Sequence, residues 1–242
     1  MQDTPTFDRQ NLILSPHDIH IWCVDLNNPP VEIQALKVTL SPDELERAVR
    51  FKFERDQQYF IAARGMLRLI LARYLNAEPE TIQFSYGSHN KPQLAAPLNT
   101  MQIEFNVAHS EGYALYAIAH GIPVGVDIES MTRAVNCTEL AERFFSPAEY
   151  QNLMQLPESL RQEAFFCAWT RKEAVIKALG LGLSFPLDQF TVSLDPRQPA
   201  VLLDIAGGVA KEWSLISYSP VPGFLGALAV HGIGYRISFR AY

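Results

Sequence analysis

Two short segments of the chain repeat one pattern, and each marks the start of a helix. Residues 40–45 read LSPDEL and residues 145–150 read FSPAEY, so that Ser41 and Ser146 lie 105 positions apart. In each segment the serine can cap a helix, the proline suits the first helical position, and the glutamate can complete a capping box. The sequence therefore predicts two helices with the same kind of start.

The elements around the two starts come in the same order: strand, capped helix, second helix, strand. Common capping chemistry can also produce such a match, but the shared order favours a duplication. We expect an α+β fold of two similar, pseudo-duplicated α/β subdomains, residues 1–112 and 113–242, with the active site in the cleft between them. The expected strands are 20–24, 81–85, 114–119, 124–129 and 190–194, and the expected second helices are 59–75 and 163–180.

Composition excludes several classes of protein. A formal charge of −6 argues against a nucleic-acid binder with a broadly basic surface. The three cysteines form no CxxC pair, which argues against a disulfide framework and against a zinc site. The first residues are polar, and no apolar run approaches the ~20 residues of a membrane span. We therefore expect a cytoplasmic protein that binds neither membrane nor nucleic acid.

The segment VGVDIE, residues 124–129, places two carboxylates on one face of a strand. Side chains alternate along a strand, so Asp127 and Glu129 share a face with Gly125. Neighbouring carboxylates repel each other unless a cation or water separates them, and a glycine on the same face leaves room for a ligand to approach. The pattern suits a hard cation such as Mg²⁺. Taken alone, however, D-x-E is explained better as a solvated strand face.

A third carboxylate lies in the helix expected over 163–180. Phe166, Trp169 and Ile176 follow helical spacing, and Glu173 falls inside that apolar stripe. A charge in such a place needs a partner. The alternative is an ordinary exposed pair with Lys177, four residues later, worth ~0.3–0.5 kcal/mol.

Other polar residues become candidates for a functional site only in combination with these carboxylates. Glu149 already has a task in the capping box, His109 is expected near a strand end, and Lys91 lies in a loop. The chain lacks a P-loop and a Gly-rich dinucleotide fingerprint. Three carboxylates with lysines and a histidine suit magnesium-assisted chemistry on a pyrophosphate.

Three motifs in order resemble the Sfp-type 4′-phosphopantetheinyl transferases. They are Lys91-Pro92 followed by FNVAHS, then VGVDIE with RFFSPAEY, then WTRKEAVIKALGLGL, and the resemblance covers about residues 40–194. Such enzymes move the phosphopantetheine arm of coenzyme A onto carrier proteins. The resemblance implies two similar α+β subdomains with coenzyme A between them, in a chain that works as a monomer.

The resemblance also implies roles for individual residues. Asp127, Glu129 and Glu173 match the magnesium ligands, and Mn²⁺ would fit the same oxygens. In this reading Gly125 leaves room for coenzyme A. The residues expected to contact coenzyme A are Arg47, Lys91, Asn106, His109, Ser110, Asp127, Lys172 and Lys177. Ala108 stands where the family commonly has serine, so we expect weaker coenzyme A binding unless Ser110 or a backbone N–H compensates.

The implied reaction is attack by a serine hydroxyl of an apo acyl or peptidyl carrier protein on the β-phosphate, with release of 3′,5′-ADP. The catalytic set is Glu173, Glu149 and Lys177, and either glutamate could be the base. Residues 131–145 are expected to face the carrier. Two alternatives stay open: a hydrolase that uses the same metal and pyrophosphate site, and a protein that binds coenzyme A or carrier without turnover.

Overall fold

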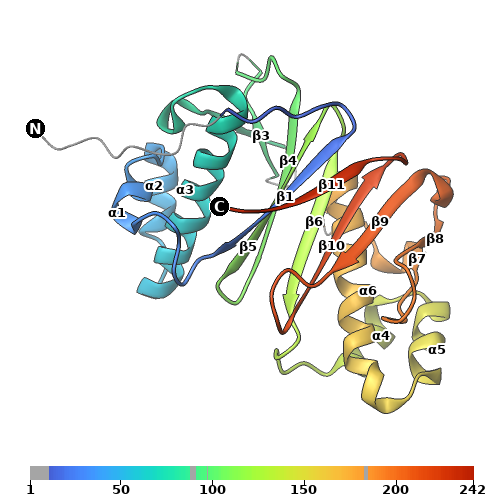
Figure 1. Ribbon diagram of the computed structural model, residues 1–242. Coiled ribbons are helices and arrows are strands. Elements are labelled where there is room, and N and C mark those ends of the chain that lie inside the picture. Colours follow the sequence, from blue (N-terminus) through green and yellow to red (C-terminus); the bar gives the residue numbers. More distant parts are fainter. Residues whose placement is uncertain (1–10, 88–90, 97, 183–184) are drawn as a thin grey trace, which may run out of the picture.

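The computed structural model describes residues 11–87, 91–96, 98–182 and 185–242, and it consists of two layered halves (Figure 1). The predicted α+β fold with two similar halves is confirmed. In the first half, a long strand, three helices, a small hairpin and a long hairpin follow one another. Their bounds are β1 Asp18–Asp25, α1 Ile33–Lys37, α2 Pro42–Ala48, α3 Glu54–Leu75, η1 Pro79–Thr81, β2 Phe84–Tyr86, β3 Pro92–Leu94, β4 Ile103–Ser110 and β5 Tyr113–His120.

The second half repeats a strand, three helices and a small hairpin, and it ends with three further strands. Their bounds are β6 Val124–Ser130, α4 Cys137–Phe144, α5 Pro147–Gln155, α6 Glu158–Leu179, η3 Leu187–Gln189, β7 Phe190–Val192, β8 Leu202–Ile205, η4 Ala210–Glu212, β9 Trp213–Tyr218, β10 Phe224–His231 and β11 Arg236–Ala241. In the described part of the chain no helix is long and apolar enough to cross a membrane.

Two sheets form the centre of the molecule. The first has the strand order β11-β1-β5-β4 and the second β6-β10-β9. Helices α1–α3 cover the outer face of the first sheet, and α4–α6 cover the second (Figure 1). The inner faces of the sheets are lined by aliphatic side chains such as Ile21, Leu115, Val126 and Leu228, which form a buried layer between the halves.

The boundary expected at residue 112 lies between two paired strands of the first sheet, β4 and β5. Strands β4 and β5 form one antiparallel hairpin, in which Ser110 is opposite Tyr113. The last strand, β11, then returns to the first sheet and pairs in parallel with β1. Two strands within the range expected for the second subdomain, β5 and β11, thus belong to the sheet of the first half.

The two predicted capping boxes are both present. Glu44 accepts a hydrogen bond from the backbone N–H of Ser41 at 3.0 Å, and Glu149 accepts one from Ser146 at 2.8 Å. The long helices α3 and α6 that follow each contain 22 residues. The repeated sequence pattern thus corresponds to a repeated helical unit.

Candidate functional site

Strand β6 and helix α6 bring the predicted carboxylates to one cavity. Asp127 and Glu129 of β6 and Glu173 and Lys177 of α6 line a cavity of about 1160 Å³. His109, at the end of β4, lines the same cavity from the first half. The structure therefore brings these five predicted site residues together.

Gly125 is the reason that α6 can approach β6 so closely. A Cβ atom at this position would lie 2.0 Å from the carbonyl oxygen of Ala174 and 2.4 Å from the backbone nitrogen of Ala178. The space next to Gly125 is therefore filled by the backbone of α6. The expectation that Gly125 leaves room for coenzyme A is wrong, because the helix occupies that room.

The carboxyl group of Asp127 is buried beside a lysine. The Nζ atom of Lys177 lies 2.5 Å from Oδ1, while Oδ2 is buried and has no hydrogen-bond partner. The pKa of Asp127 is raised to about 7: burial is the main cause, Lys177 opposes it, and the charges of Glu173 and Glu129 act in the same direction as burial. An unpaired buried oxygen among like charges is a favourable place for a cation.

Glu173 and Glu129 complete this acidic group. Burial and the charge of Glu129 raise the pKa of Glu173, and Lys177 opposes the shift. No group of three or more His, Cys, Asp or Glu side chains is already arranged to hold a metal ion among the described residues. The three carboxylates nevertheless fit Mg²⁺ chemically, because they are hard oxygen donors that face one cavity, and one of their oxygens lacks a partner.

Ser110 contacts Glu129. Its hydroxyl group donates a hydrogen bond to Oε2 of Glu129 at 3.0 Å, and Arg133 lies 3.6 Å from the other carboxylate oxygen. The hydroxyl that the sequence suggested as a phosphate donor is therefore engaged by a carboxylate of the site.

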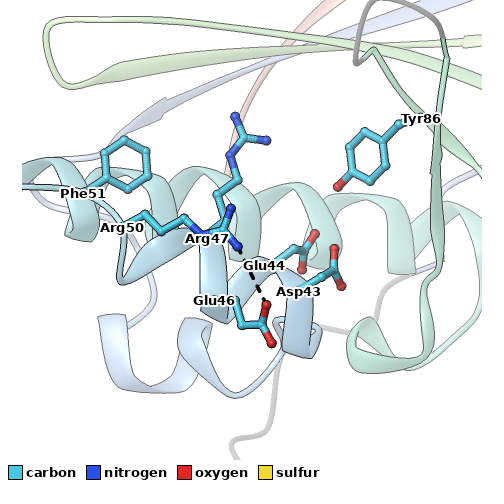
Figure 2. A pocket seen from close by; sticks show the side chains of 7 residues that line it. All are labelled: Asp43, Glu44, Glu46, Arg47, Arg50, Phe51 and Tyr86. Carbon is cyan, nitrogen blue, oxygen red and sulfur yellow. Dashed lines mark ion pairs between the residues drawn. The ribbon is translucent and has the colours of Figure 1, made fainter.

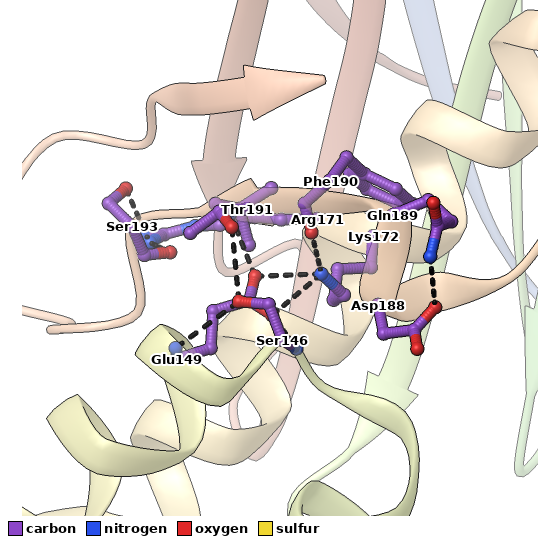
Figure 3. Close-up of polar contacts among 10 residues, drawn as sticks. Ser146, Glu149, Arg171, Lys172, Asp188, Gln189, Phe190, Thr191 and Ser193 are labelled. Atoms are coloured by element: carbon purple, nitrogen blue, oxygen red, sulfur yellow. Dashed lines mark hydrogen bonds and ion pairs between the residues drawn. The ribbon is translucent and has the colours of Figure 1, made fainter. Parts of the chain in front are cut away.

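Glu149 and Lys172 lie outside the cavity and form a fully buried ion pair (Figure 3). The Nζ atom of Lys172 lies 2.7 Å from both carboxylate oxygens of Glu149 and donates to the carbonyl of Phe190 at 2.6 Å. Glu149 also accepts from the backbone N–H groups of Ser146 and Val192. Because both charged groups are inaccessible, the structure gives no support to the predicted roles of Glu149 as a base and of Lys172 as a phosphate ligand.

His109 connects the cavity of the carboxylates to a second cavity, of about 530 Å³. Arg47 lines the second cavity, with its guanidinium 5.3 Å from the centre of the Phe60 ring. Burial and the charge of Lys177 lower the pKa of His109. A ligand that extends from the carboxylates past His109 could therefore reach Arg47.

Lys91 and Asn106 connect the halves. The Nζ atom of Lys91 donates to the carbonyl oxygens of Lys177 at 2.8 Å and Val124 at 3.4 Å. Asn106 is buried on β4 and accepts a hydrogen bond from the N–H of Val126 at 2.9 Å. The structure places neither residue in the lining of the two cavities, so their expected contacts with the nucleotide stay predictions.

Ala108 is buried in the aliphatic layer between the sheets. Its methyl group lines neither cavity. A hydroxyl group at this position would enter an apolar layer, and the structure therefore gives no support to the expected loss of coenzyme A affinity.

The cavity also has an apolar wall that the sequence interpretation did not assign to the site. Phe144, Trp169, Phe185 and Leu187 line it together with the carboxylates. For Trp169 the sequence did contain an indication, because this residue lies four positions before Glu173 and therefore on the same helical face. Phe144 ends α4, Phe185 lies in a loop and Leu187 begins the short η3, so none of them belongs to a long periodic pattern.

Two family models match the chain. The model described as 4′-phosphopantetheinyl transferase superfamily covers residues 123–229, and the one described as 4′-phosphopantetheinyl transferase, N-terminal, covers residues 28–120. The two matches meet between β5 and β6.

Curated relatives agree with these matches. The chain is 38% identical over 232 residues to the 4′-phosphopantetheinyl transferase HetI of Nostoc sp. strain PCC 7120, covering 96% of this chain and 95% of that protein. It is 32% identical over 155 residues to the 4′-phosphopantetheinyl transferase Sfp of Bacillus subtilis strain 168, covering 64% of this chain and 66% of that protein.

A solved structure of Helicobacter pylori holo-[acyl-carrier-protein] synthase in complex with coenzyme A overlaps only in part, with 21% identity and a TM-score of 0.36 over 45% of this chain and 99% of that chain. The relatives and the family models together cover nearly the whole chain. The chain is therefore a member of the 4′-phosphopantetheinyl transferase superfamily, of the Sfp type.

Proposed function

We propose that this chain moves the 4′-phosphopantetheine arm of coenzyme A onto a serine hydroxyl of an apo carrier protein and needs Mg²⁺ to do so. Transfer of phosphopantetheine is the activity of the family. The metal requirement and the placement of coenzyme A are supported by one observation: Asp127, Glu129, Glu173 and Lys177 line the same cavity. His109 lines this cavity and also the second one, which Arg47 lines.

In the proposed reaction the serine oxygen forms a bond to the β-phosphorus of coenzyme A. The bond from that phosphorus to the leaving 3′,5′-ADP breaks, and the serine proton passes to a base. Asp127, Glu129 and Glu173 would hold the Mg²⁺, which when bound supplies positive charge beside the pyrophosphate oxygens. Lys177 adds a further positive charge at the same place.

Glu173 is the base in this proposal. Of the two glutamates considered, it is the one that reaches the cavity, because Glu149 is fully buried and paired with Lys172.

We further propose that the protein acts as a monomer in the cytoplasm. Both halves and both cavities belong to one chain, and the three cysteines are free. Light scattering during size-exclusion chromatography tests the monomer, and a dimer mass that persists on dilution would contradict it.

The first experiment mixes the protein with coenzyme A, Mg²⁺ and an apo acyl carrier protein, and measures the intact mass of the carrier. We expect a gain of one phosphopantetheine that is lost in chelator and in Glu173→Gln. Glu158→Gln, an exposed change at the start of the same helix, is the matched control and should retain transfer.

Two outcomes would overturn the proposal. Release of 3′,5′-ADP without any carrier would indicate a hydrolase. Binding of coenzyme A without mass gain on several apo carriers would indicate a binding protein.

A further inference from the structure

The loop that joins α2 to α3, together with the end of α2 and the start of α3, concentrates positive charge in an acidic chain. We call residues 47–55 the basic loop; it reads RAVRFKFER. Arg47, Arg50, Lys52 and Arg55 lie in it with a single acid, Glu54, whereas the whole chain has 20 Lys and Arg against 26 Asp and Glu. Residues 47–55 carry a formal charge of +3 on a chain of −6, and the flanking Glu46 and Asp56 lower it to +1 for residues 46–56.

Apolar side chains alternate with the cations and are exposed to solvent. Val49 is 71% exposed, Phe51 39% and Phe53 59%. Aromatic residues and arginine together are typical of protein interfaces, whereas exposed phenylalanine has no favourable role in a loop that only meets water. The basic loop therefore has the composition of a binding surface.

Two cations of the basic loop, Arg50 and Lys52, are held by weak contacts. Arg50 lies 3.9 Å from Glu46, and both side chains are more than 70% exposed. The Nζ atom of Lys52 lies 5.4 Å from the centre of the Phe53 ring. Exposed contacts of this kind are worth little, so a partner could replace them at low cost.

The basic loop borders the route to the proposed active site. Arg47 and Phe51 line the cavity that His109 connects to the carboxylates. Arg47, Arg50 and Phe51 also gather at one side of a neighbouring cavity of about 620 Å³, with Tyr86 at the opposite side (Figure 2). Three acids, Asp43, Glu44 and Glu46, line the same cavity. A macromolecule bound to the basic loop would thus lie beside the cleft.

The segment expected from the sequence to face the carrier lacks such a charge. Residues 131–145 contain Arg133 and Arg143 but also Glu139 and Glu142, so their formal charges cancel. Apolar contact with a partner at Phe144 remains compatible with this segment, but it offers no electrostatic attraction.

We propose that the basic loop docks an acidic face of the carrier protein, with Arg50 and Lys52 attracting it and Phe53 packing against an apolar side chain. The inference rests on the proposed function, because the partner is the acceptor of the phosphopantetheine arm. Complementary charge would mainly speed encounter and would make it sensitive to salt.

The test compares Lys52→Glu with Lys211→Glu, which makes the same charge change at an exposed lysine of η4 in the other half. Arg50→Glu and Phe53→Ser complete the set; all these side chains are exposed, so the fold should survive. The apparent KM values for carrier and for coenzyme A are measured separately. Binding of a fluorescently labelled apo carrier is measured by anisotropy, which needs no transfer.

We expect Lys52→Glu and Arg50→Glu each to weaken carrier binding about fivefold, to raise the KM for carrier equally, and to reduce its salt dependence. The KM for coenzyme A should not change, and Lys211→Glu should behave as wild type. Failure of the wild type to transfer would count against the proposed function alone, because the anisotropy comparison still decides the docking surface.

Three results would overturn the inference. A raised KM for coenzyme A with unchanged carrier binding would assign the basic loop to the nucleotide. If Lys211→Glu weakened carrier binding equally, the effect would come from the net charge of the protein and not from the basic loop. Displacement of the carrier by an unrelated single-stranded oligonucleotide at equal concentration would indicate a general polyanion surface.

Discussion

Arg68 in α3 and Lys172 in α6 are equivalent residues of the two halves. Each lies at the same position of a 22-residue helix, fourteen residues after its first residue, at 54 and 158. Each pairs at 2.7 Å with the glutamate of the preceding capping box, Arg68 with Glu44 and Lys172 with Glu149. The repeated SPxE pattern thus builds the same buried ion pair twice.

The next residue distinguishes the halves. Leu69 follows Arg68 and is buried in the first core, whereas Glu173 follows Lys172 and faces the cavity. A single position in the duplicated helix therefore separates a packing residue from a site carboxylate. This accounts for the helical carboxylate of the site, whereas Asp127 and Glu129 come from β6.

Replacing Lys172 with methionine should lower stability rather than affinity for coenzyme A. The change leaves the carboxylate of Glu149 buried without its cation, which typically costs about 3–5 kcal/mol. Urea unfolding at pH 7 measures the loss, with Lys211→Met as the control for one missing positive charge. Unchanged stability together with a raised KM for coenzyme A would restore the phosphate-binding role expected from sequence.

Gly125→Ala should destabilise the second half strongly. The new methyl group would meet the backbone of α6 at 2.0 Å, and backbone atoms cannot rotate away as a side chain can. We expect a loss of about 3 kcal/mol or more. Gly87→Ala is the matched control, because nothing lies within 4 Å of its added Cβ. Equal stability of the two variants in urea would show that α6 shifts without cost.

The sequence predicted the helices and strands better than it predicted which elements pack against one another. Capping boxes and strand alternation are local, so both repeated helix starts and the face shared by Asp127 and Glu129 could be predicted. What packs against a face is not local, which is why α6, rather than coenzyme A, fills the space at Gly125. The parallel pairing of β11 with β1 joins the two ends of the chain and leaves no local signal.

The two lysines of α6 show the same limit. Lys172 and Lys177 are five residues apart and point to different sides of the helix. Because α6 is buried nearly all round, its apolar pattern does not reveal which side meets the cavity. The family motif contains both lysines, and the packing separates their tasks.

A buried histidine should make stability depend on pH. His20 is 3% exposed; its Nδ1 lies 2.7 Å from the Tyr74 hydroxyl and its Nε2 lies 3.2 Å from a guanidinium nitrogen of Arg240. Burial, aided by the charge of Arg240, lowers the pKa of His20 to about 4 from 6.5. Between these values the unfolded chain binds more protons than the folded one, so stability falls as pH falls.

Between pH 7 and pH 5, protonation linked to His20 should lower the free energy of unfolding by about 2 kcal/mol. His20→Gln keeps polar atoms but cannot titrate, so its unfolding free energy should vary less between pH 7 and pH 5. His231→Gln, an exposed change, serves as the control. Parallel pH profiles for all three proteins in urea unfolding would contradict the assignment.

Ser110 provides a test of the proposed magnesium site that separates two roles. Its hydroxyl donates to Glu129 at 3.0 Å, so it should orient a proposed metal ligand rather than bind a phosphate. Loss of such a supporting hydrogen bond typically costs 10–100-fold in metal affinity. We expect Ser110→Ala to need about tenfold more Mg²⁺ for half-maximal transfer, with the KM for coenzyme A unchanged at saturating Mg²⁺.

Calorimetric titration with Mg²⁺ or Mn²⁺ gives a second measurement that does not depend on turnover. Ser110→Thr keeps the hydroxyl and should restore most of the affinity, which a simple packing defect would not allow. A raised KM for coenzyme A with unaltered metal binding would instead assign the hydroxyl to the phosphate. In that case the hydrogen bond to Glu129 would have to break when coenzyme A binds, since one hydroxyl hydrogen cannot serve both acceptors.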